Sequence, residues 1–177
     1  DIVVANADGS QASTITGNAN RDIHPAWSPD GTSIAFGALV DGNWDVYVMQ
    51  SNGEGLTRIT TEASLDYGPV WSPDGTRLAF VTDRDGRWEI YTANSDGSHV
   101  TRLTTAGGLA PQYSPDGTKI AFYTTHNGDD DAFVVPAEGG NPTRLTHHPD
   151  HDRRPCWSPD GQFLVFEADR GGNTDLY

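Results

Sequence analysis

The chain has 177 residues, of which 35% are hydrophobic, and it contains 20 glycines, 11 prolines and one cysteine. This length suits one domain with a core or a short array of repeats, and no stretch is apolar for long enough to span a membrane. A net charge of −14 repels phosphate backbones and anionic lipids, so it argues against a nucleic-acid partner and against membrane insertion. The sequence also shows no signal-peptide pattern.

One motif occurs four times and organises the chain. The string "PAWSPDGTSIAF" at 25–36 returns as "PVWSPDGTRLAF", "PQYSPDGTKIAF" and "PCWSPDGQFLVF". Its aromatic residue falls at Trp27, Trp71, Tyr113 and Trp157, at intervals of 44, 42 and 44 residues. An R-[IL]-T string closes each of the first three copies 33 residues after the aromatic residue. Such a period indicates a repeat architecture of stacked supersecondary units.

The elements follow in chain order. Residues 1–16 are predicted to form two outer strands, and 152–177 two inner strands. Full four-stranded units are predicted over 22–60, 66–104 and 108–146. Branched and aromatic residues alternate with period two in these units, and turn residues such as Asp41-Gly42 and Asn127-Gly128 separate the strands. No window shows helical periodicity with caps.

The predicted fold is therefore all-β, with each unit a four-stranded antiparallel blade of a β-propeller. Asp1 and Asp175 share one register of the repeat, so the two terminal pieces complement each other. We expect strand exchange between the termini to close the ring, either as four blades in one chain or as eight blades in a homodimer. A third alternative is a fragment of a larger six- to eight-bladed protein.

Several residues are expected to be structural. Trp27, Trp71, Tyr113 and Trp157 should lie on the innermost strands and pack between neighbouring blades. Asp30, Asp74, Asp116 and Asp160 belong to the repeated SPDG string and are expected in tight turns, without an acid–base role. Cys156 cannot form an internal disulfide and is expected to be a small buried thiol.

The repeat resembles a known family. Matching stretches are "HPAWSPDGTSIAF…DGNWDVYVMQSNGEGLTRIT" and "GPVWSPDGTRLAF…DGRWEIYTANSDGSHVTRLT", and the chain is similar throughout to the TolB-type, WD-like β-propeller repeat family. The resemblance implies a bladed toroid that binds other proteins, in a bacterial periplasmic or secreted location. In TolB the propeller engages a lipoprotein at one mouth of its channel. Similar repeats accompany serine peptidases, but this sequence has no G-x-S-x-G elbow.

The candidate sites lie in the connectors between units, which share one face of a propeller. Asp22, Asp66 and Asp152 each stand five residues before an aromatic residue, where the third copy has Gly108. They are predicted at the channel mouth, where three carboxylates could hold a cation such as calcium. Other loop-face candidates are His24, Tyr67, His147, His148, His151, Arg153 and Arg154, and the histidines offer an alternative transition-metal site. Similar repeats occur on metal-dependent lyases.

These features favour a non-catalytic propeller that binds a protein or peptide at the inter-blade loop face, with no cofactor expected. One alternative is a propeller with a metal or cation site at the channel mouth, related to an enzyme-associated propeller. Another is a repeat fragment or engineered array without an evolved ligand.

Overall fold

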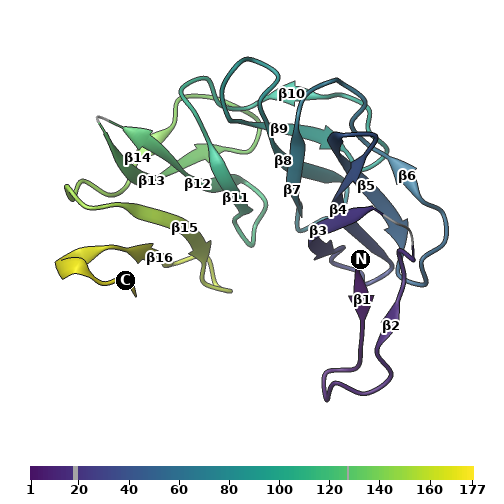
Figure 1. Ribbon diagram of the computed structural model, residues 1–177. Coiled ribbons are helices and arrows are strands. Elements are labelled where there is room, and N and C mark those ends of the chain that lie inside the picture. Colours follow the sequence, from purple (N-terminus) through teal and green to yellow (C-terminus); the bar gives the residue numbers. More distant parts are fainter. Residues whose placement is uncertain (18–19, 127) are drawn as a thin grey trace.

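The computed structural model describes residues 1–17, 20–126 and 128–177, and Figure 1 shows their arrangement. Three four-stranded antiparallel sheets follow one another along the chain, and each is a simple meander. The first contains β3 (Arg21–Trp27), β4 (Ser33–Val40), β5 (Asn43–Gln50) and β6 (Thr57–Arg58). The second contains β7 (Asp66–Trp71), β8 (Arg77–Thr82), β9 (Glu89–Asn94) and β10 (Thr101–Arg102). The third contains β11 (Leu109–Tyr113), β12 (Lys119–His126), β13 (Asp129–Pro136) and β14 (Thr143–Arg144).

Two smaller sheets stand at the ends of the chain. A hairpin of β1 (Val3–Val4) and β2 (Ser13–Thr14) precedes the first blade. The last sheet contains β15 (Asp152–Trp157), β16 (Leu164–Ala168) and β17 (Asp175–Leu176), with a short 3-10 turn (Arg170–Gly172) before β17. The sequence predicted two strands for the last sheet. The structure has three, because β17 adds to β16 as a short third strand. The all-β propeller architecture is confirmed.

The blades form an arc, with the N-terminal hairpin at one end and the last sheet at the other (Figure 1). Among the described residues, β1 and β2 pair only with each other, and the last sheet pairs with neither of them. Ring closure by strand exchange is thus not made within this chain and stays a prediction. The expected Asn127-Gly128 turn falls partly outside the described residues. No described helix is long and apolar enough to cross a membrane.

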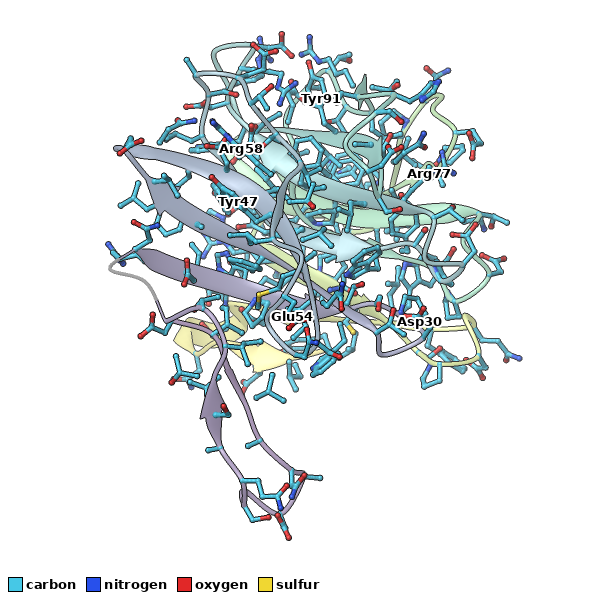
Figure 2. The ribbon with its side chains drawn as sticks, turned by 90° about the vertical axis from the view of Figure 1, so that its right-hand side faces the viewer. Asp30, Tyr47, Glu54, Arg58, Arg77 and Tyr91 are labelled. Carbon is cyan, nitrogen blue, oxygen red and sulfur yellow. The ribbon has the colours of Figure 1, made fainter. Side chains whose placement is uncertain are left out.

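Apolar side chains fill the two junctions between the three complete blades. Between the second and third blades, Ile90 and Leu103 pack with Ile120, Phe122 and other buried residues. Between the first and second blades, a second cluster contains Val46, Ile59, Leu78 and Phe80. The N-terminal hairpin extends away from the sheets in Figure 2, but its base packs through Ile2 onto the first blade. Blades therefore hold together mainly by burying the faces that a single sheet would expose.

An ion pair between a buried carboxylate and a partly exposed arginine joins the two outer strands of every complete blade. Asp45, Glu89 and Asp131 are fully buried on the third strands. Their carboxylates pair with Arg58, Arg102 and Arg144 on the fourth strands, at 2.7, 2.9 and 2.7 Å. The threonine of each R-[IL]-T string also bonds to the third strand of its blade. In the first blade, Thr60 Oγ1 accepts a hydrogen bond from the Val46 amide at 2.9 Å. The repeated string therefore ties the third and fourth strands of each blade together through its arginine and its threonine.

The four SPDG aspartates lie in tight turns at one end of the sheets; Asp30 marks this turn face in Figure 2. Each carboxylate accepts a hydrogen bond from the preceding serine hydroxyl at 2.6 Å. In the third blade, hydrogen bonds from the Ser114 hydroxyl and from the backbone and side chain of Thr118 lower the pKa of Asp116 to about 2.

The inner-strand aromatic residues differ in environment. Trp71 and Trp157 donate from Nε1 to the backbone carbonyls of Ala26 and Gln112, at 3.0 and 3.3 Å, across a blade junction. Tyr113 is buried at its junction. The expectation is wrong for Trp27, which is 52% exposed because no blade precedes its inner strand within the chain.

Candidate functional site

The four inner strands, β3, β7, β11 and β15, face the axis of the arc, and each carries a β-bulge. The pairing register shifts between Ile23 and Ala26 in β3 and at the equivalent place in the other three strands. The bulged residue has a positive φ in every copy: 52° at His24, 63° at Gly68, 49° at Ala110 and 48° at Arg154. Only one of the four is glycine, so three blades retain a strained backbone at the same position.

These bulges surround a cavity of about 600 Å³ on the axis. Its wall is mostly apolar, with prolines and small residues from all four inner strands. The polar and aromatic lining comes from His24, Tyr67, Gln112, Tyr123 and Arg154, and Cys156 also lines it. Cys156 is exposed, so the expectation of a buried thiol is wrong. A bulge leaves backbone groups outside the strand ladder, so the cavity also offers main-chain donors and acceptors.

Aromatic contacts organise one side of the cavity. The His24 and Tyr67 rings lie 5.8 Å apart, and Tyr67 meets Trp88 edge-on at 5.2 Å. Burial, helped by the nearby Tyr123 and Asp83, raises the pKa of Tyr67, so its hydroxyl stays protonated. On the other side, the Arg154 guanidinium pairs with Glu167 at 3.1 Å and remains largely exposed. The cavity thus combines stacking surfaces, a hydroxyl and one accessible cation.

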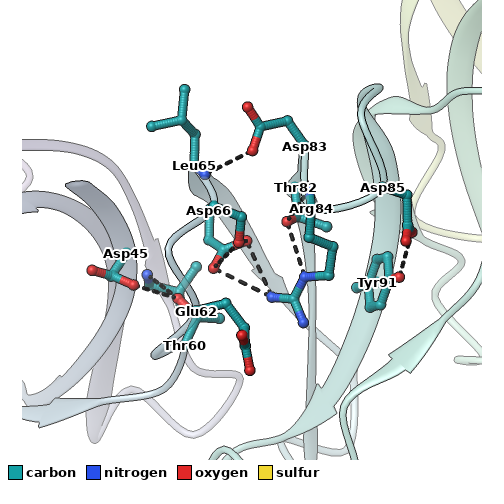
Figure 3. A network of polar contacts seen from close by, with 12 residues as sticks. Asp45, Thr60, Glu62, Leu65, Asp66, Thr82, Asp83, Arg84, Asp85 and Tyr91 are labelled. Atoms are coloured by element: carbon teal, nitrogen blue, oxygen red, sulfur yellow. Dashed lines mark hydrogen bonds and ion pairs between the residues drawn. The ribbon is translucent and has the colours of Figure 1, made fainter.

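The predicted channel-mouth aspartates do not lie free at the mouth. Asp66 and Asp152 are completely buried and pair with Arg84 at 3.2 Å and Arg170 at 3.3 Å. Figure 3 shows Asp66 held by the Arg84 guanidinium, which also approaches Thr82. Burial raises the pKa of Asp66, against the opposing effects of Thr82 and Arg84. These two carboxylates belong to the interior of their blades, and each is already paired with an arginine there.

Asp22 has the same register but lacks these partners. Its cross-strand neighbour is Ala38, where Asp66 has Thr82. Two residues further on, Val40 stands where the second blade has Arg84. In the described part of the chain neither carboxylate oxygen of Asp22 has a hydrogen-bond partner, and its nearest cation is the Asp1 α-ammonium, 4.0 Å away. The side chain is nevertheless fully buried.

The histidine-rich connector before β15 forms separate local pairs. His148 lies 3.2 Å from Asp150, and His151 lies 3.3 Å from Asp130. Arg153 also bonds to Asp130. Burial alone would raise the pKa of Asp130, but the Thr125 hydroxyl and the Arg153 guanidinium outweigh it and lower this pKa.

His147 and His148 are exposed. No group of three or more His, Cys, Asp or Glu within the described ranges is arranged to hold a metal ion. The predicted convergence of Asp22, Asp66 and Asp152, or of the three histidines, on one cation is therefore not observed.

Of the loop-face candidates, the structure brings His24, Tyr67 and Arg154 to one cavity. It leaves His147, His148, His151 and Arg153 outside that lining. Sequence reasoning missed Tyr123 and the bulges themselves. A signal was available, because every copy has proline two residues before its aromatic residue. Proline restricts the residue before it and cannot donate to a strand ladder, which is typical of an edge or bulge.

Comparisons with known proteins agree with this geometry. The model of the TolB beta propeller domain matches residues 1–110 and 107–177. No curated protein sequence matches the chain. A TolB structure from Agrobacterium tumefaciens is 28% identical with a TM-score of 0.80 over 92% of this chain and 60% of that one.

TolB from Acinetobacter baumannii is 24% identical with a TM-score of 0.74, over 98% of this chain and 55% of that one. An oligogalacturonate lyase in complex with manganese has a TM-score of 0.78 at 20% identity, over 97% of this chain and 51% of that one. The last two likenesses concern the fold alone. The chain spans 60% or less of the length of these three structures. Because the family model matches the chain along its length, the chain belongs to the TolB β-propeller domain family.

Proposed function

We propose that this chain is a non-catalytic propeller that binds a protein or peptide segment in the axial cavity at its inter-blade loop face. The observation that carries the proposal is the cavity of about 600 Å³ lined by all four inner strands. A concave, mostly apolar site with a few polar groups suits a side chain or a short extended segment. The His24–Tyr67–Trp88 aromatic group supplies the kind of surface that dominates protein recognition.

Charge narrows the class of partner. The net charge of −14 speeds encounter with basic partners and disfavours nucleic acids. Within the cavity, the exposed Arg154 guanidinium suits a carboxylate or carbonyl group of the segment. We therefore infer a partner that is basic overall and inserts an apolar or aromatic residue. Membership of the TolB domain family supports a periplasmic or secreted location.

Binding, without catalysis, also fits the state of the ionisable groups near the cavity. Arg154 pairs with Glu167, and Arg153 pairs with Asp130. The buried Asp66 and Asp152 are held by arginines of their own blades. These contacts stabilise the charges already present.

The test is selection of peptides that bind the purified chain, followed by affinity measurements on cavity variants. Arg154→Gly and His24→Gly place in these blades the residue that the second blade already has at this bulge, Gly68, so the backbone should be retained. We expect these variants and Tyr67→Ala to weaken binding, with Tyr67→Ala raising Kd by about 30-fold, the effect of losing a central aromatic anchor.

Leu56→Ala is the control, because Leu56 is 56% exposed and does not line the cavity. Circular dichroism must show that each variant keeps its fold. The proposal is wrong if the cavity variants bind the peptides as tightly as the native chain does, or if Leu56→Ala is the variant that loses binding.

A further inference from the structure

Each of the three junctions between neighbouring blades also has a pocket on the turn face. The pocket between the first and second blades has a volume of about 520 Å³. The next junction has a pocket of about 540 Å³, and the junction with the last sheet has one of about 330 Å³. None of the described residues that line the first pocket also lines the axial cavity, and both blades that form it are complete. The first pocket is therefore a separate site.

The three pockets share an acidic wall. Hydrogen bonds within the turns, above all from the serine hydroxyl, lower the pKa of all four SPDG aspartates, so these carboxylates are ionised at neutral pH. Two of them line each pocket: Asp30 and Asp74 the first, Asp74 and Asp116 the second, Asp116 and Asp160 the third.

Two of the three pockets contain a cation of the chain's own. Arg77 lines the second pocket, where it pairs with Glu138 of the next blade, and Lys119 lines the third (Figure 2 labels Arg77). Both stand three residues after an SPDG aspartate. In the first blade that position is Ser33, and no arginine or lysine among the described residues lines the first pocket. This pocket therefore has a pair of carboxylates but no cation in its wall.

The first pocket also has an aromatic wall. Trp71 packs against the apolar cluster between the first two blades, and its Nε1 donates to the Ala26 carbonyl at 3.0 Å, which fixes the ring. The same side chain lines the pocket. The face of an indole attracts a cation more strongly than the ring of a tyrosine does, and the next junction has the buried Tyr113 at this position. An indole beside two carboxylates suits an organic cation.

The main chain of this wall offers few hydrogen-bond donors. The amides of Thr32, Ser33 and Gly75 already donate within their own turns, at 3.0, 2.9 and 2.9 Å. The two SPDG prolines that line the pocket have no amide proton. A bound peptide segment would therefore leave backbone carbonyls without partners. The volume of the pocket, in contrast, lies in the range of small-molecule sites.

We propose that the pocket between the first and second blades binds a free small molecule with an alkylguanidinium group. The cation lies against Trp71 and pairs with Asp30 or Asp74, and so supplies the charge that Arg77 supplies in the next pocket. A guanidinium is planar and weakly hydrated, so it can stack on an aromatic ring and pair with a carboxylate at once. The inference does not depend on peptide binding in the axial cavity.

Backbone amide NMR during titration with ethylguanidinium tests the proposal. We expect saturable shifts at Gly75, which lines the first pocket, and none at Gly117 or Gly161, which line the pockets of Arg77 and Lys119. Ethylurea has the same shape without the charge and should shift none of the three glycines. The absence of a saturable shift at Gly75, or equal shifts at all three glycines, overturns the proposal.

Matched variants place the cation in the pocket. Ser33→Arg gives the first pocket the arginine that the next one has, so it should raise the Kd of ethylguanidinium at least about tenfold. Phe163→Arg is the control, because it adds the same charge at the same position of the repeat, 68% exposed and outside this pocket. Asp30→Asn should also raise Kd about tenfold, whereas Asp160→Asn should leave it unchanged. Equal effects within either pair of variants contradict the proposed position.

The tripeptide Gly-Arg-Gly separates a free ligand from an arginine side chain of a protein partner. We expect it to bind no more tightly than ethylguanidinium, because the wall has few main-chain donors for its backbone. Binding at least about tenfold tighter would assign the pocket to a protein partner and overturn the proposal.

Discussion

Tyr113 and Tyr91 are both buried, yet their hydroxyls have opposite surroundings. Tyr91 donates to Asp85 Oδ2 at 2.5 Å. The Tyr113 hydroxyl has no hydrogen-bond partner among the described residues. An unsatisfied buried polar group costs about 1–3 kcal/mol, and a hydrogen bond to a charged group contributes about 1.5–3 kcal/mol. Tyr113→Phe should therefore raise the free energy of unfolding by about 1 kcal/mol, and Tyr91→Phe should lower it by about 1–2 kcal/mol.

The same residue predicts a pH dependence. Burial raises the pKa of Tyr113 from 10.0 to about 12. Because the folded-state pKa is the higher one, the associated stability is fully present below pH 10 and is lost as the pH rises towards 12. Two pKa units correspond to about 2.7 kcal/mol, so the native chain should lose up to about that amount through this residue. The Tyr113→Phe variant, which lacks this hydroxyl, should lose less free energy of unfolding over the same pH range.

Urea unfolding followed by tryptophan fluorescence, at fixed protein concentration, measures both effects. The native chain and the two variants are compared at pH 7 and at steps up to pH 11.5. If Tyr113→Phe destabilises at pH 7 as much as Tyr91→Phe does, the Tyr113 hydroxyl has a partner and the reasoning fails.

Further predictions concern single positions. Gly107→Ala should lower the free energy of unfolding by at least about 2 kcal/mol more than Gly128→Ala in urea titrations, because both have φ of 98° but only at Gly107 would a Cβ meet another atom, at 2.3 Å. Equal losses would contradict this. Val40→Arg should stabilise the chain by about 1 kcal/mol by giving Asp22 a guanidinium partner, and thermal unfolding should show no gain when Asp22→Asn is also present. Carboxylate NMR titration should find Asp116 ionising near pH 2, so that its contribution is present above its ordinary pKa and lost as the pH falls through about 2; an ordinary value would contradict its turn contacts.

The blade architecture was readable because every copy carries its strands, turns and closing R-[IL]-T string at fixed distances. Each blade needs the same local interactions, so repetition made one pattern visible several times. The environment of Trp27 could not be read in this way. Its local sequence matches that of Trp71. The indole of Trp71 packs on a preceding blade, whereas that of Trp27 has no preceding blade within the chain and is exposed.

The surroundings of Asp22, Asp66 and Asp152 were not predicted, for a different reason. Local sequence placed Asp66 and Asp152 at a channel mouth, because the arginines that bury them follow 18 residues later. The first copy has Val40 instead of that arginine, so comparing copies would have revealed the pairing and the isolation of Asp22. The bulges were missed because a residue before proline was read as ordinary extended strand, although φ is positive there in all four copies.

The central claim is that partners bind at the axial cavity and not at the turn face. Backbone amide NMR with a selected peptide tests it, because each blade carries one reporter on each side. Bulge residues His24, Gly68, Ala110 and Arg154 line the cavity, and Gly31, Gly75, Gly117 and Gly161 lie in the SPDG turns. The account predicts that saturating peptide shifts the bulge amides and leaves the turn glycines unchanged. Shifts confined to the turn glycines would contradict it.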